Sequence, residues 1–175
     1  SGGNRTGFQV RTPGGQEPPH GPMVIMGNYA RDYGWDWDVK NGGSCITIWE
    51  SLDFPVYIVN NSITNAKYGC VAIAHQPPNQ ESPFLPSGRA HSKVVFWSNS
   101  FSNPDGDRSA VSISSTERAQ VLLNRINGAQ ADIVIDSDTA WKWGARPCRK
   151  ATVAKQLTTS LDIIQWNGRE YVDWD

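Results

Sequence analysis

Short apolar runs separated by polar, turn-forming residues make up most of the chain. Such runs occupy residues 44–50, 55–60, 68–75, 92–98, 110–114 and 131–135. Val, Ile and aromatic side chains pack well on a pleated surface, whereas Gly, Pro, Asn and Ser favour turns. The pattern predicts about ten short strands, and we expect the first four to form a meander.

Residues 116–126 instead have the spacing of an amphipathic helix. Ser114 and Glu117 fit a capping box at its start, and Gly128 suits a C-terminal cap. Four apolar residues recur at i, i+3, i+4 and i+7, namely Ala119, Leu122, Leu123 and Ile126. This spacing places them on one face and predicts a short helix.

Two further runs, residues 161–166 and 169–174, flank Asn167-Gly168. Asn-Gly accepts the positive φ angles of a type I′ turn, so these runs predict an antiparallel hairpin. We see no internal repeat in the chain.

The elements together predict an antiparallel β-sandwich or jelly-roll-like domain over residues 23–175, with the helix at about 116–126 plugging an end or covering a face. A β-barrel with a lid helix is the alternative fold. Residues 1–22 are rich in Gly and Pro and predict a flexible tail or linker. We expect the chain to be a piece of a larger protein, because it lacks an initiator Met and a signal peptide.

Charge and cysteine content exclude several classes of protein. The 16 Lys and Arg residues nearly balance the 17 Asp and Glu residues, and without a basic cluster nucleic-acid binding is disfavoured. No apolar run is long enough for membrane insertion.

Three cysteines without CxxC spacing argue against a disulfide scaffold or structural zinc. Cys45 and Cys70 pair in an oxidising compartment or stay free, and free thiols are favoured.

Paired tryptophans are the strongest functional signal. Eight Trp occur in 175 residues, four of them in Trp35-Asp36-Trp37 and Trp141-Lys142-Trp143. In an extended chain both indoles of a pair lie on one face, where they form a flat platform suited to sugar rings. The predicted ligand-binding residues are Tyr33, Trp35, Asp36, Trp37, Asp38, Trp141, Lys142 and Trp143. The competing interpretation is that these indoles belong to the core.

Other candidate chemistry is weaker, and we predict no metal or cofactor. Asn103, Asp105 and Asp107 resemble the first ligands of a calcium loop, but Arg108 and Ser114 stand where an EF-hand needs Gly and Glu. The region is therefore either a looser calcium loop or a plain turn.

A thiol hydrolase would combine Cys45 with His75 or His91 as the base. However, Cys45 lies in a strand pattern rather than at a helix N-terminus, where the helix dipole lowers a thiol pKa. The Ser-hydrolase, zinc-protease, Walker and dinucleotide motifs are all absent from the sequence. We therefore assign no catalytic residue.

These observations favour a non-catalytic binding domain of a larger extracellular or virion-surface protein, such as a viral spike. It would recognise glycan or a protein receptor through exposed aromatic residues and loops. One alternative is a small secreted hydrolase that uses an Asp pair or a Cys/His pair. The other is a structural, capsid-type module that associates with copies of itself.

Overall fold

All paired strands of the molecule run parallel, in three sheets. The computed structural model describes residues 8–10, 21–34, 44–48, 54–73, 92–114, 116–135, 148, 151–154, 157, 161–165 and 172–174. Sheet A contains β1 (Phe8–Val10), β4 (Ile46–Ile48), β7 (Val71–Ile73), β10 (Val111–Ile113), β13 (Ile133–Ile135) and β15 (Ile163–Gln165). Sheet B contains β2 (Met23–Met26), β5 (Pro55–Val59), β8 (Lys93–Trp97), β11 (Ala119–Leu122), β14 (Ala151–Ala154) and β16 (Val172–Trp174). Sheet C contains β3 (Tyr29–Arg31), β6 (Ser62–Thr64), β9 (Ser100–Asn103) and β12 (Arg125–Gly128).

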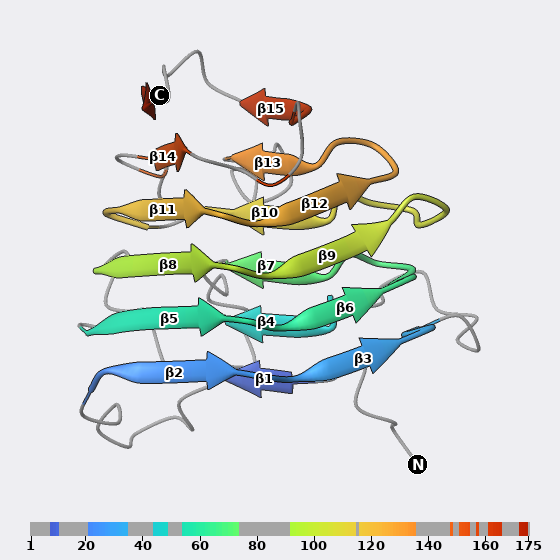
Figure 1. The fold of residues 1–175 in the computed structure, drawn as a ribbon, viewed down its shortest axis with the longest axis horizontal. Coiled ribbons are helices and arrows are strands. Elements are labelled where there is room, and N and C mark those ends of the chain that lie inside the picture. The colour runs from blue at the N-terminus through green and yellow to red at the C-terminus, as the bar shows by residue number, and fades with distance from the viewer. Residues whose placement is uncertain are drawn as a thin grey trace, which may run out of the picture.

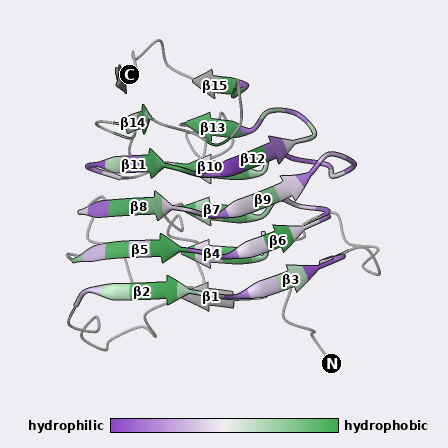
Figure 2. Ribbon diagram, viewed as in Figure 1, coloured by the Kyte–Doolittle hydropathy of each residue, from purple (hydrophilic) through white to green (hydrophobic). Residues whose placement is uncertain are grey.

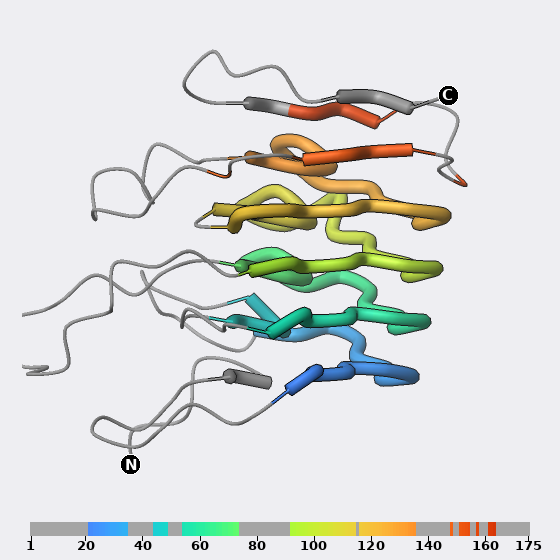
Figure 3. The backbone as a smooth tube through the Cα atoms, turned by 90° about the vertical axis from the view of Figure 1, so that its left-hand side faces the viewer, coloured from blue at the N-terminus to red at the C-terminus, as the bar shows by residue number. Residues whose placement is uncertain are grey.

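The chain winds through sheets A, B and C in turn, so each circuit is one coil of a solenoid. Coil 1 is β1–β3, coil 2 is β4–β6, coil 3 is β7–β9 and coil 4 is β10–β12. Each strand pairs with its counterpart in the neighbouring coil (Figure 1), and the coils lie one above another in side view (Figure 3). This arrangement is a parallel β-helix.

The predicted antiparallel β-sandwich or jelly roll is therefore wrong, as is the barrel alternative. Parallel sheets are usually buried on both faces and show continuous apolar runs, whereas one-sided burial is typical of antiparallel sheets. Here burial alternates along β5, β7, β10 and β11, although β4 and β13 are buried throughout. The alternating strands resemble antiparallel ones, so the sequence pattern indicated the wrong pairing.

The predicted helix at 116–126 is also wrong, and the described part of the chain contains no helix, hence none that could span a membrane. Ala119 and Val121 point inward from β11, the chain turns at Leu123, and Ile126 points inward from β12. A strand, a corner and a second strand thus place apolar residues at the same sequence spacing as one face of a helix. The Ser114 hydroxyl does not cap a helix but donates to the Ile73 carbonyl oxygen at 3.1 Å.

The predicted hairpin is wrong as well. β15 extends sheet A beside β13, and β16 extends sheet B beside β14. Each strand pairs in parallel with the strand of the preceding coil, so the two strands lie in different sheets and are not paired with each other. Asn167-Gly168 itself lies outside the described residues.

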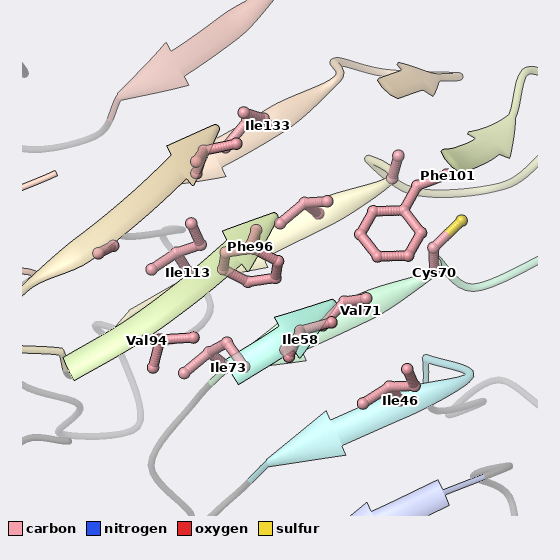
Figure 4. Packing of buried hydrophobic residues seen from close by; sticks show 14 of the residues in the cluster. Ile46, Ile58, Cys70, Val71, Ile73, Val94, Phe96, Phe101, Ile113 and Ile133 are labelled. Atoms are coloured by element: carbon pink, nitrogen blue, oxygen red, sulfur yellow. The ribbon is translucent and has the colours of Figure 1, made fainter. Parts of the chain in front are cut away.

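The interior is filled by columns of aliphatic side chains that run along the solenoid. One column in sheet A is made only of isoleucines, Ile48, Ile73, Ile113 and Ile135, all in register. Phe96 and Phe101 fill the side towards sheets B and C (Figure 4). Each of these side chains is at most 1% exposed, and full burial of one contributes roughly 1.5–3 kcal/mol.

A ladder of asparagines lines the corner between sheets B and C. It consists of Asn28, Asn61, Asn99 and Asn124. The backbone N–H and Nδ2 of Asn61 both donate to Oδ1 of Asn99, at 2.9 and 3.0 Å. Asn99 donates in the same way to Asn124, at 2.9 Å for both bonds. These bonds satisfy polar groups that the tight corner would otherwise bury unpaired.

The asparagine ladder marks a structural repeat, one asparagine in each of coils 1 to 4, that the sequence analysis did not find. A residue with positive φ precedes each ladder asparagine, in the order Gly27, Asn60, Ser98 and Leu123. Successive ladder asparagines are 33, 38 and 25 residues apart. Because the coils differ in length at the other corners, no fixed period is present for a pattern search to find.

Candidate binding face

The outer surface of sheet B carries a row of apolar side chains across the coils. Successive side chains along a strand point inward and outward in turn, although Val95, on the outward side of β8, is itself buried. The outward residues next to the B–C corner are in register in coils 1 to 4, namely Met26, Val59, Trp97 and Leu122. We call these four residues the Trp97 row.

Trp97 gives this row its aromatic character. The indole is 51% exposed although the preceding residue, Phe96, is fully buried. Its strand neighbours are Val59 on one side and Leu122 on the other, both half-buried. Trp97 therefore extends outward between two apolar residues, with about half of its surface open to solvent.

Polar groups follow directly beyond the row, on the corner and on the start of sheet C. Asn60 and Ser98 are exposed at the corner, and the Asn60 N–H donates to the Trp97 carbonyl oxygen at 3.0 Å. Ser62 and Ser100 are the next outward residues, in register on β6 and β9. Figure 2 shows the same change, from strongly hydrophobic strands in sheet B to paler and purple strands in sheet C. An aromatic surface bordered by hydroxyls and amides matches the two faces of a sugar ring.

Charge in this region is positive. The strands of sheets B and C in coils 1 to 4 contain Arg31, Lys93 and Arg125 but no Asp or Glu. Arg31 is paired with Asp32, whose Oδ2 lies 3.4 Å from the arginine Nε. Arg125 is exposed, and its side chain forms no ion pair or hydrogen bond with the described residues.

Of the eight predicted ligand-binding residues, only Tyr33 lies within the described ranges. Tyr33 is half-buried at the corner between sheets C and A, where it packs against the core. The other seven, Trp35, Asp36, Trp37, Asp38, Trp141, Lys142 and Trp143, lie outside the described residues. Their part in binding stays a prediction.

Cys45 and Cys70 are buried beside Tyr33, and both are free thiols. Burial raises the pKa of the Cys45 thiol to about 11. Burial also raises the pKa of Cys70, with a smaller contribution from Cys45, and it raises the pKa of Tyr33 likewise. A thiol with this pKa is protonated at neutral pH and is a poor nucleophile. His75 and His91 lie outside the described residues.

The Asn103–Asp107 segment is a turn that packs against the preceding coil. Asn103 is fully buried and its Nδ2 donates to the Arg108 carbonyl oxygen at 2.7 Å. Asp105 and Asp107 are exposed, and the Asp107 N–H donates to the Lys67 carbonyl oxygen at 2.7 Å. Within the described ranges, no group of three or more His, Cys, Asp or Glu residues is arranged to hold a metal ion.

The sequence analysis missed Trp97, although a signal for it was present. Val94 and Phe96 alternate in a predicted strand, which assigns Trp97 to the opposite, outward face. The Trp-x-Trp pairs drew attention away from this single indole. Comparisons with protein-family models, with curated proteins and with solved structures gave no match.

Proposed function

We propose that the chain is a non-catalytic binding domain of a larger extracellular or virion-surface protein, and that it recognises glycan at the Trp97 row. The observation that carries this proposal is the half-exposed Trp97 indole on a flat sheet face, bordered by Asn60, Ser98 and Ser100. The apolar face of a sugar ring would stack on the indole. Its hydroxyls would bond to the corner residues.

The chemistry of the buried thiols also favours binding over catalysis. The raised pKa of Cys45 leaves it protonated, and the residue is buried rather than presented to a substrate. Met26 and Trp97 of the Trp97 row, in contrast, are exposed to solvent. A binding role needs only such a surface, with several weak contacts that add up when the parent protein presents many copies.

The test uses the full chain and its Trp97→Ala variant against a panel of neutral and acidic oligosaccharides, with binding measured by titration calorimetry. Loss of stacking is worth roughly 1–1.5 kcal/mol, so we expect about tenfold weaker binding. Tyr29→Ala is the comparison variant: it removes another exposed aromatic side chain, which lies in register with Ser62 and Ser100 but two coils from Trp97, so we expect a smaller loss of binding. Unfolding in urea should be nearly unchanged for both variants. Binding that survives Trp97→Ala, or a panel without any binding, contradicts the proposal.

A protein partner is the second candidate, and the exposed residues Val24 and Met26 favour it. They are 56% and 65% exposed on the outer face of β2, where sheet B is most apolar. Contiguous exposed apolar residues are typical of contacts between proteins. Sedimentation velocity over a range of concentrations tests self-association through this face, and Met26→Lys should abolish any dimer that forms there.

A further inference from the structure

Arg125 is an exposed cation on the coil next to Trp97. β12 is exposed at Arg125, buried at Ile126 and exposed again at Asn127, so Arg125 points outward from sheet C. It pairs in register with Ser100, which itself begins the strand that follows the corner after Trp97. The guanidinium and the indole therefore extend from the same side of the molecule, one on each flank of the B–C corner.

The surroundings leave this charge uncompensated. The chain is described without a break through this corner in coils 1 to 4, and its strands there contain no carboxylate. The described acids lie beyond the ends of these strands. Asp132 accepts from the Gly128 N–H at the far end of β12 and from the Asp162 N–H, Asp105 and Asp107 follow β9, Asp32 pairs with Arg31, and Glu117 lies before β11. An unpaired arginine beside an aromatic platform is complementary to an anionic group on a stacked ring.

We propose that the glycan bound at the Trp97 row is acidic, with a sugar carboxylate held by Arg125; this rests on the proposed glycan-binding function. The planar guanidinium fork matches a carboxylate with two parallel N–H···O bonds. The ring that carries this carboxylate stacks on Trp97, and the corner residues Ser98 and Asn60 bond to its hydroxyls. Lys93, on the outer face of sheet B, adds a second positive charge along the same strand as Trp97.

Matched pairs of sugars test the charge preference. The probes are β-1,4-linked hexamannuronate against mannohexaose, and the glucuronate hexamer against cellohexaose. In each pair the rings that can stack are closely similar, and one member adds a carboxylate. For at least one pair we expect the acid to bind roughly two- to fivefold more tightly in low salt, the range for one exposed ion pair. This preference should shrink as salt screens the charge.

Variants at arginine residues test whether Arg125 causes the preference for the acidic sugar. Arg125→Gln should remove the preference for the acid, because it weakens binding of the acidic partner more than binding of the neutral partner. Arg31→Gln is the matched control, because it makes the same change on the same sheet at an arginine already paired with Asp32. Arg125→Lys should give an intermediate preference, because it keeps the charge but loses the fork.

The outcomes separate the two proposals. If no sugar binds, glycan recognition itself fails. If acidic and neutral partners bind equally and Arg125→Gln changes nothing, glycan recognition stands and the acidic preference is refuted. A hexathymidylate that binds as tightly as hexamannuronate, and depends on Arg125, would show a general anion site and overturn the assignment to a sugar acid.

Discussion

Asn99 lies in the middle of the asparagine ladder and bonds to both neighbouring coils. Its Oδ1 accepts from Asn61, and its Nδ2 donates to Asn124 Oδ1 and to the Ile58 carbonyl oxygen at 2.8 Å. All of these groups are buried. Truncating the side chain would therefore leave several polar atoms unpaired in the interior, each costing about 1–3 kcal/mol.

We expect Asn99→Ala to lower the free energy of unfolding by roughly 3 kcal/mol, measured by urea denaturation. Asn28→Ala is the matched control: Asn28 is exposed and its side chain only donates, so we expect a loss below about 1 kcal/mol. Equal losses for the two variants would show that the ladder does not contribute as its geometry indicates.

The buried thiols predict lower stability in alkali. The pKa of Cys45 rises from 9.0 to about 11 on folding, so between these values the unfolded chain releases a proton that the folded chain keeps. The free energy of unfolding therefore falls as pH rises from 9 to 11, by about 1.4 kcal/mol per pH unit for this thiol. Cys70 acts in the same direction.

Urea denaturation at pH 8, 9, 10 and 11, with reductant present, measures this slope. Cys45→Ala should lose some stability at pH 8 but show a shallower decline between pH 9 and 11. Parallel curves for the two proteins would mean that Cys45 titrates alike in the folded and unfolded states.

At the scale of the element, the segment from β11 to β12 is the most informative, because its spacing fits both a helix and a strand-corner-strand. Leu123 distinguishes them. It is 37% exposed with φ at 54°, a conformation that costs a leucine roughly 1–2 kcal/mol and an asparagine less. Asn60 occupies the equivalent corner position in coil 2 with φ at 51°.

We therefore expect Leu123→Asn to raise the free energy of unfolding by roughly 0.5–1 kcal/mol. Leu123→Ala, the control, should not stabilise, because alanine has no preference for this conformation. A helix would show the reverse order, with asparagine less stable than alanine by roughly 0.7 kcal/mol. Urea denaturation of both variants decides between the two.

The sequence predicted many strands of sheets A and B, but none of the four strands of sheet C was predicted as a strand, and the predicted pairing was wrong. β5, β8, β10 and β13 lie within predicted strands, because Val and Ile between turn residues indicate extended chain whatever its partner. The partner depends on contacts between residues 20 to 40 positions apart, which neither periodicity nor turn preference reports. Leu123 shows the limit most clearly, since nothing local marks a leucine for positive φ.

The sequence predicted the type of residue at the candidate site but not its position. Exposed aromatic residues were expected, and Trp97 is one, but the spacing of Trp pairs selected other residues. Arg125 could not have been associated with Trp97 from the sequence. Their proximity results from the register between β9 and β12 and from the corner at Ser98.

At the scale of the whole molecule, each coil contacts only the coils next to it. Stability in such a solenoid is close to a sum of coil terms and nearest-neighbour terms, so the ends should open more readily than the middle. We expect amide hydrogen exchange to be slowest in β5, β8 and β10, which pair on both sides, and faster in β2 and β16, which pair on one side among the described strands. Uniform exchange across all coils would instead indicate a single all-or-none unit.

The in-register pairing of β9 with β12 means that residues 100–124 form one complete circuit, ending one coil above the position where it began. A tandem copy of this stretch would meet the same corner, the same asparagine and the same inward side chains. The solenoid would then be taller by one strand spacing, about 4.8 Å, with its outer face extended by the same step. The height of the outer face along the solenoid axis is thus set by the number of coils.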